Sequence, residues 1–170
     1  MIDPVGQPKE YQRMLLSQLG DRDPAEVQAE TGPELRSLVA GAGEALRKRP
    51  APGDWSVIEV LGHILDAEIV HAARYRWIVA HDEPPIVGYD QDLWVDRLRY
   101  RTDGDPHEML ALFDALRRSN LALWERSAPE DRARVGMHAE RGPESFDLTF
   151  RLIAGHDLLH TEQLRRALEA

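Results

Sequence analysis

The sequence predicts an all-α protein, a four-helix bundle with a long crossover between its second and third helices. Four stretches repeat apolar residues at the three- and four-residue spacing of amphipathic helices, and no strand pattern competes with them. The pattern breaks from His81 to Gly104, between the second and third of these stretches. A connection of this length allows consecutive helices of a bundle to run parallel. At 170 residues the chain is expected to form a single domain.

Residues 1–30 are predicted to form a short N-terminal helical arm that packs on a bundle of residues 31–170. Before Gly20, apolar residues of the arm lie at helical spacing, at Tyr11, Met14, Leu15 and Leu19. A second helix start follows, with a capping residue, a first-turn proline and a third-position acid in Asp23-Pro24-Ala25-Glu26. A structural role is the favoured interpretation of this arm.

Capping residues mark the expected starts of the four long helices. The first is predicted to begin at Thr31, which has capping-box spacing to Glu34, and to end before Pro50. The second begins with the capping box Ser56-Val57-Ile58-Glu59. The third begins at Asp105-Pro106-His107-Glu108. The fourth follows a polar loop of residues 129–144 and begins near Ser145 or Asp147.

Composition and charge exclude several kinds of protein. The hydrophobic fraction of 42% and the charged fraction of 30% are typical of a globular domain. The absence of cysteine excludes disulfides and thiolate ligands, so a metal would need imidazole, carboxylate or water. A net charge of −9 argues against a nucleic-acid partner. Because neither a membrane-length apolar run nor a signal peptide is visible, we expect a cytoplasmic location and no membrane partner.

Two histidines of the predicted fourth helix, His156 and His160, are four residues apart. This spacing puts both imidazoles on one helix face, where they could share a metal ion if a third ligand joins them. Asp157 and Glu162 rotate away from that face at 100° per residue. His63 of the second helix reaches the level of the pair if the two helices are neighbours with aligned ends. Taken alone, the pair is also compatible with hydrogen-bonding residues in a helix interface.

Three polar residues near these histidines have two interpretations each. Glu59 precedes His63 by one turn and could bind the metal, but its capping role is favoured. Asp66, one turn after His63, is a candidate catalytic residue that could orient an imidazole or act as a base, and a solvated aspartate fits equally well. Gln163, one turn past His160, is the second candidate catalytic residue. It could hydrogen-bond a bound water, although an interhelix amide contact is favoured.

Two motifs resemble those of the DinB/YfiT-like superfamily of metal-dependent hydrolases. The second-helix motif of that family resembles Trp55-Ser56-Val57-Ile58-Glu59-Val60-Leu61-Gly62-His63-Ile64-Leu65-Asp66-Ala67-Glu68. Its C-terminal HxxxH motif resembles His156-Asp157-Leu158-Leu159-His160, followed by Gln163-Leu164. The two motifs occur in the family's order, and the resemblance runs in register over residues 31–168.

The resemblance implies a four-helix bundle with a long crossover and one divalent metal ion held by His63, His156 and His160. Three imidazoles leave coordination positions open, as in catalytic sites. Nickel and zinc are the expected ions, with iron and manganese as alternatives, because all four accept imidazole. Relatives of the family include S-transferases that use bacillithiol or mycothiol, so a low-molecular-weight thiol is an alternative co-substrate.

Other histidines and arginines carry weaker hypotheses. His138 lies in the polar loop and could close over the site, although an exposed loop histidine is favoured. Three arginines of the crossover could receive the carboxylates of a thiol cofactor, although a solvated charged stretch explains them better; they are Arg97, Arg99 and Arg101. Three further histidines have no identifiable partner, namely His71, His81 and His107.

The expected function is that of a metal-dependent hydrolase or a thiol-dependent S-transferase acting on a small molecule. The alternative is a non-catalytic helical bundle that binds a ligand or partner, with a structural metal or none. A site sealed by the crossover, or a fourth protein ligand, would favour that alternative. A homodimer is expected, because relatives of this fold often pair through helix faces.

Overall fold

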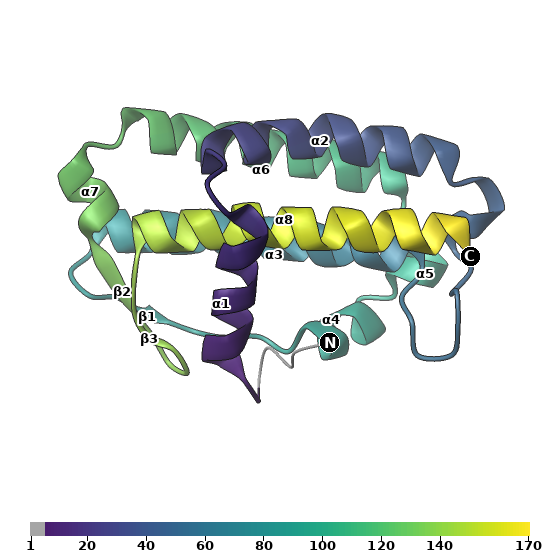
Figure 1. Ribbon diagram of the computed structural model, residues 1–170, viewed down its shortest axis with the longest axis horizontal. Coiled ribbons are helices and arrows are strands. Elements are labelled where there is room, and N and C mark those ends of the chain that lie inside the picture. The colour runs from purple at the N-terminus through teal and green to yellow at the C-terminus, as the bar shows by residue number, and fades with distance from the viewer. Residues whose placement is uncertain (1–5) are drawn as a thin grey trace.

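Four long helices form the body of the molecule in the computed structural model, which describes residues 6–170. They are α2 (Pro24–Gly41), α3 (Val57–Ala80), α6 (Pro106–Arg126) and α8 (Phe146–Glu169), and they lie along the long axis (Figure 1). Helix α8 packs against α2 and α3, and α6 packs against the same two helices. The predicted four-helix bundle is confirmed. Residues 1–5 of the predicted arm lie outside the described residues.

The connection between α3 and α6 contains strand β1 (Pro85–Ile86) and two short helices, α4 (Gln91–Arg97) and α5 (Tyr100–Asp103). It runs back along the bundle, so that α6 starts at the same end of the molecule as α3 (Figure 1). Gly104, just before α6, accordingly lies against Ile58 at the start of α3. Helices α3 and α6 therefore run parallel, and the predicted crossover is confirmed.

Helix α2 begins and ends earlier than the sequence indicated. It starts at Pro24, because the Asp23 carboxylate accepts hydrogen bonds from two first-turn amides at 2.7 and 3.0 Å. Thr31, the expected cap, lies inside the helix, so α2 crosses the boundary expected after residue 30. The helix ends at Gly41 rather than before Pro50. Gly43 has a left-handed φ of 50°, and only a 3-10 turn, η1 (Gly43–Leu46), follows.

A small sheet at one end of the bundle was not expected from the sequence. Strand β1 pairs in parallel with β2 (Val135–His138), which pairs in antiparallel fashion with β3 (Gly142–Ser145). Helix α7 (Pro129–Ala133) precedes β2, so the predicted polar loop is largely structured. The sequence showed no strand pattern at these positions, so the sheet was not predicted. Strands this short do not show an alternating pattern, and the pairing of β1 joins segments far apart in the chain.

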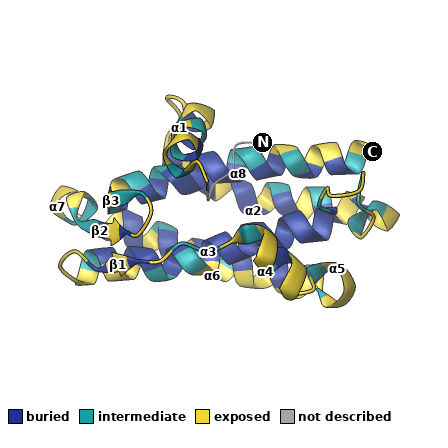
Figure 2. Cartoon of the chain, turned by 90° about the horizontal axis from the view of Figure 1, so that it is seen from below, coloured by how far each residue is buried: buried dark blue, intermediate teal, exposed yellow. Residues whose placement is uncertain are grey.

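Buried residues lie on the inward faces of the four helices (Figure 2), and the apolar residues among them form the core. One apolar cluster includes Leu35, Ile58 and Phe113, and a second includes Tyr75 and Phe150. Along α3, α6 and α8, a group of polar residues lies between these two clusters. No helix among residues 6–170 is both long and apolar enough to cross a membrane.

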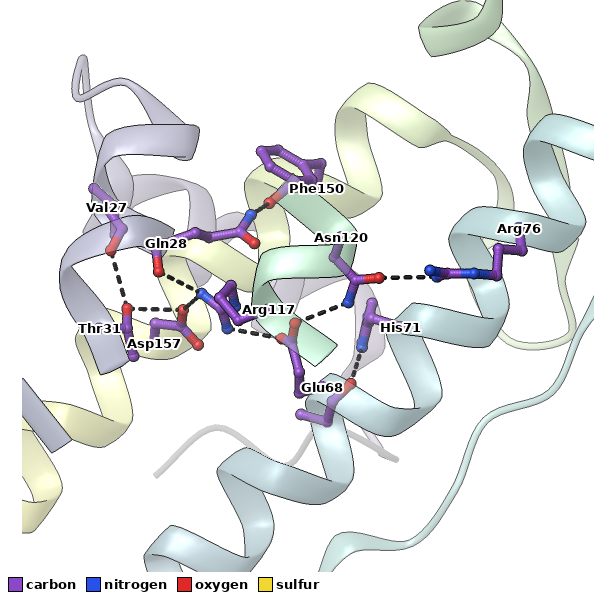
Figure 3. Close-up of polar contacts among 11 residues, drawn as sticks. Val27, Gln28, Thr31, Glu68, His71, Arg76, Arg117, Asn120, Phe150 and Asp157 are labelled. Carbon is purple, nitrogen blue, oxygen red and sulfur yellow. Dashed lines mark hydrogen bonds and ion pairs between the residues drawn. The ribbon is translucent and has the colours of Figure 1, made fainter. Parts of the chain in front are cut away.

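Arg117 is the centre of this buried polar group (Figure 3). Its guanidinium forms ion pairs with Glu68 at 2.7 Å and with Asp157 at 2.5 Å. It also donates a hydrogen bond to the carbonyl oxygen of Gln28 at 3.0 Å. Asn120 donates to the same Glu68 carboxylate at 2.8 Å. Side chains of α3, α6 and α8 and the backbone of α2 thus meet at one arginine.

Helix α1 (Pro8–Leu19) crosses α8 on the outside of the bundle (Figure 1). The two helices approach most closely at Gly155, where a Cβ would lie only 2.1 Å from the carbonyl oxygen of Leu15. Tyr11, Leu15 and Leu152 form a small apolar cluster between them. Because Gly155 has no side chain, the backbone of α1 can reach α8 directly beside His156.

We expect Gly155→Ala to displace α1 and to lower the free energy of unfolding by about 1–3 kcal/mol, because the added methyl group overlaps backbone atoms. Urea denaturation measures the loss, and faster amide exchange over residues 8–19 locates it. Gly41→Ala is the matched control, since a Cβ at that helical glycine meets nothing within 4 Å. Equal stability of the two variants would contradict the close approach.

Candidate metal centre

The structure brings His63, His156 and His160 together in the interior of the bundle. Helices α3 and α8 are antiparallel neighbours, so His63 lies opposite the pair from α8. The Nε2 atom of His63 lies 2.9 Å from Nε2 of His156 and 3.2 Å from Nε2 of His160. The three side chains are buried, and their ligand atoms all lie within 4.8 Å of one another. All three residues are the metal ligands that the family resemblance implied.

The donor set fits a divalent metal ion. A neutral imidazole has one donor and one acceptor nitrogen, so protons alone cannot satisfy three Nε2 atoms that face each other. Metal–nitrogen bonds of about 2.0–2.1 Å place ligand nitrogens about 3 Å apart, which is close to the spacing of these atoms. No carboxylate completes the group among residues 6–170. The cluster therefore offers three ligands and leaves further coordination positions open.

Burial keeps these histidines neutral. It lowers the pKa of His63 and of His156 well below the usual 6.5, and the neighbouring His160 adds to both shifts. Burial also lowers the pKa of His160 to about 4, although a hydrogen bond with Gln163 opposes that shift. Metal ions bind the neutral imidazole. The fold therefore holds the candidate ligands in the metal-binding form at neutral pH.

We expect the metal-free protein to lose stability as the pH falls from about 6.5 toward 4. An unfolded histidine takes up a proton near pH 6.5, whereas folded His160 stays neutral down to about pH 4. Neutral His160 therefore contributes its full amount to the free energy of unfolding above about pH 6.5. About 2 kcal/mol of this contribution is lost by about pH 5. Urea denaturation with a chelator measures this loss. His160→Gln, which cannot titrate, should lose about 2 kcal/mol less over the same interval, and equal losses in both proteins would contradict the assignment.

Gln163 orients one of the three histidines. The Nδ1–H of His160 donates a hydrogen bond to Oε1 of Gln163 at 2.8 Å, within the same helix. This bond leaves the lone pair of Nε2 free to face the other two imidazoles. The hydrogen bond of Gln163 thus lies within α8 rather than between two helices. The Nδ1 atoms of His63 and His156 have no hydrogen-bond partner among the described residues.

Replacing Gln163 with leucine is expected to weaken metal affinity by about 10- to 100-fold, since His160 loses the acceptor that fixes its tautomer. Competition with a chromogenic chelator measures the affinity. Glu162→Gln, an exposed change at the preceding residue, should leave it unchanged. Unaltered affinity in Gln163→Leu would show that the hydrogen bond is dispensable.

Glu59 caps α3, as the sequence favoured. Its Oε2 accepts hydrogen bonds from the Ser56 amide at 2.9 Å and from the Ser56 hydroxyl at 2.7 Å. The same carboxylate is paired with Arg49 at 2.5 Å, so it is not directed at the histidines. Trp55 packs its ring near His63, with the ring centroids 5.1 Å apart.

Asp66 does not orient an imidazole. Its Oδ1 accepts a hydrogen bond from the Tyr100 hydroxyl at 2.6 Å, and its Oδ2 has no partner among the described residues. Burial raises the pKa of Asp66 to about 6, although the Tyr100 hydrogen bond opposes the shift. The Tyr100 ring lies against Gly62, where a Cβ would come within 2.2 Å of it. The hydrogen bond between Asp66 and Tyr100 thus links α5 of the crossover to α3 beside His63.

A pocket with a volume of about 80 Å³, partly open to solvent, borders the histidine cluster. Along α3 its lining runs from His63 to Arg74, and His156 also contributes. Helix α1 supplies Tyr11, and the crossover supplies Tyr89. The three histidines are therefore buried in the bundle, yet two of them, His63 and His156, line a pocket that is partly open to solvent.

The remaining candidates from the sequence lie outside this pocket. His138 is buried in strand β2 rather than exposed in a loop, which corrects the favoured interpretation, and burial lowers its pKa to about 4. The arginines of the crossover do not line the pocket, and Arg101 instead lies 3.8 Å from Glu59. His81 and His107 are exposed.

Sequence reasoning missed three residues that line the pocket: Tyr11, His71 and Arg74. Arg74 could have been found, because it follows His63 by three helical turns on the same face. Tyr11 offers no such signal, since its position depends on how α1 docks against α8.

The fold and the site together define a class: helical-bundle proteins with a three-histidine candidate metal centre beside a small-molecule pocket. Comparison with known families gives the particular assignment. The chain belongs to the DinB superfamily, whose family model matches residues 28–164. The resemblance found in the sequence is confirmed.

Two relatives are similar to this chain. A protein of Oceanobacillus iheyensis named "Putative metal-dependent hydrolase OB0782" is 28% identical over 109 residues, or 64% of this chain. The chain spans 62% of that protein's length. YfiT from Bacillus subtilis, described as "a probable metal-dependent hydrolase with an unusual four-helix bundle topology", has a TM-score of 0.78 and 21% identity. That match covers 85% of this chain and 83% of YfiT, and it shows a shared fold.

Proposed function

We propose that the protein is a metalloenzyme that holds one divalent ion through His63, His156 and His160 and hydrolyses a small molecule. The main support is the position of the three-histidine cluster at the border of an open pocket. Structural metal sites are closed by four protein ligands, whereas catalytic sites keep a position open. The names of the relatives support hydrolysis as the reaction. A non-catalytic bundle with a structural ion leaves the pocket unexplained.

The residues of the chain supply the conditions for such a reaction. Bound at the cluster, a divalent ion would provide Lewis-acid chemistry. Burial keeps the three imidazoles neutral, and Gln163 holds Nε2 of His160 toward the cluster. Residues of helix α1 and of the crossover line part of the pocket. Asp66 does not line the pocket, so we assign it a structural role rather than that of a base.

Nickel and zinc remain the preferred ions, with iron and manganese as alternatives. Elemental analysis of protein produced without a histidine tag in metal-replete medium tests the site, and the expected result is about one ion per chain. Protein that stays metal-free under these conditions would refute the proposal.

The reaction itself is tested by screening metal-loaded and metal-stripped protein against small esters, amides and alkylating electrophiles. Turnover of an ester or amide without thiol supports hydrolysis. Turnover that requires a low-molecular-weight thiol would assign thiol-dependent S-transfer to the same site. In either case we expect activity to disappear in the metal-stripped protein.

We also propose that the protein is a cytoplasmic homodimer. Large apolar side chains are exposed on the helices of the bundle, among them Ile69 and Trp77 on α3 and Leu112 on α6. Burying such side chains against a second copy is favourable. A light-scattering mass equal to that of one chain would refute the dimer.

A further inference from the structure

The pocket contains a buried positive charge without a carboxylate partner. Arg74 is 4% exposed, and no carboxylate forms an ion pair with it among residues 6–170. Its guanidinium donates to the carbonyl oxygen of Val87 at 2.7 Å and to Nε2 of His71 at 3.3 Å. Both acceptors are neutral, because Nδ1 of His71 donates its proton to the Ala67 carbonyl. The charge of Arg74 is therefore hydrogen-bonded but not compensated.

Neighbouring charges do not remove this imbalance. Arg141, which also lines the pocket, uses two nitrogens on Glu144, at 2.5 and 3.0 Å. Glu144 additionally accepts a hydrogen bond from Gln12 at 2.9 Å, so it is already occupied. Glu140 also lines the pocket, but it is exposed. Burial and the proximity of Arg141 lower the pKa of Arg74, although the nearby Glu144 opposes this shift.

Two further polar atoms beside the pocket have no partner. The hydroxyl of Tyr11 is buried and makes no hydrogen bond among the described residues, and Nε of Arg74 is in the same state. Buried donors of this kind are rare in folded proteins unless a ligand or water satisfies them. An oxyanion would satisfy the tyrosine hydroxyl and compensate the guanidinium.

The pocket also has an apolar part of its lining. Leu15, Ala67, Leu152 and Ile153 line it. In an α-helix, the Cα atoms of His63 and Arg74 lie about 16 Å apart along the axis of α3. Their side chains differ by a rotation of only about 20° about that axis. The pocket therefore has a cationic region, an apolar region and a histidine region in sequence along one helix face.

We propose that Arg74 and Tyr11 form a subsite for the carboxylate of a small organic acid, whose apolar chain extends toward the three histidines. A single uncompensated guanidinium matches a monoanionic carboxylate, which it can bind through two hydrogen bonds. The role of the histidines toward this ligand rests on the proposed function, whereas the carboxylate contact needs no metal. The substrate class is thus a carboxylic acid with a reactive group several bonds from the carboxylate.

Binding of octanoate and of octanamide to metal-stripped protein, measured by calorimetry in the presence of a chelator, tests the subsite. The wild type should bind octanoate at least about tenfold more tightly than octanamide, because only the anion gains a charge-assisted contact. Arg74→Gln should remove this preference. Tyr11→Phe, which preserves the ring, should reduce octanoate affinity severalfold without changing octanamide affinity. Arg97→Gln, at an exposed arginine of α4, is the matched control and should bind both probes as the wild type does.

The thermal stability of the variants separates a binding role from a structural one. Arg74→Gln removes an uncompensated buried charge, so we expect a melting temperature no lower than that of the wild type. Equal affinity of the wild type for both probes, binding of neither, or a preference that persists in both Arg74→Gln and Tyr11→Phe would overturn the subsite. Because no metal is present, an octanoate preference in a protein that also fails to bind metal ions would support the subsite while refuting the proposed metalloenzyme.

Discussion

Replacing His63 or His160 with alanine is expected to weaken the binding of the divalent ion by more than about 100-fold, beyond the effect of losing an outer hydrogen bond. Each variant retains two imidazoles in the cluster, and no carboxylate among residues 6–170 lies there to replace the third. Metal-dependent activity should disappear with the ion. Elemental analysis after dialysis, together with competition against a chromogenic chelator, measures the loss.

Two exposed histidines provide the matched controls for this experiment. His81 and His107 lie outside the cluster, so their alanine variants should bind the ion as the wild type does. Circular dichroism in a chelator must show that His63→Ala and His160→Ala remain folded. If the cluster variants and the control variants bound metal equally, the ion would have to occupy a different site.

Arg117→Ala is expected to lower the free energy of unfolding by about 3–5 kcal/mol, the largest loss of stability that we predict for a single substitution. The change leaves the carboxylates of Glu68 and Asp157 buried without their counterion. Burial already raises the pKa of Asp157, and the guanidinium of Arg117 opposes that shift. Urea denaturation at neutral pH measures the effect. Arg118→Ala, an exposed change at the next position of α6, should alter stability little.

A rescue experiment distinguishes the lost charge pairing from simple loss of packing. Adding Glu68→Gln and Asp157→Asn to Arg117→Met removes the two unpaired charges and restores an apolar side chain of similar length. This triple variant should recover a large part of the lost stability, since it no longer contains buried carboxylates without a counterion. A triple variant less stable than Arg117→Met alone would contradict the electrostatic explanation.

The sequence by itself determined the bundle and the identity of the histidine cluster. Helical periodicity and capping residues located α3, α6 and α8, because these signals are local in the chain. The four-residue spacing of His156 and His160 placed both on one helix face for the same reason. The long break between α3 and α6 indicated the crossover, since short connections cannot link parallel helices.

Other features depended on contacts between segments far apart in the chain. The strands were missed because β1 pairs with β2 only in the folded molecule. The close contact at Gly155 depends on the path of α1, which no local pattern records. Asp157 was expected to turn away from the inward-facing histidine face, yet it is buried and pairs with Arg117 of α6, a contact that depends on helix packing.

The same reason explains the unequal outcome at the candidate site. Helical geometry alone could name His63, His156 and His160, but the pocket beside them exists because α1 and the crossover enclose it. Nothing in the sequence distinguishes Arg74 from other arginines. Only the tertiary structure shows that it is buried and has no carboxylate partner among residues 6–170. Local periodicity thus determined which residues face inward, whereas the docking of distant segments determined what they face.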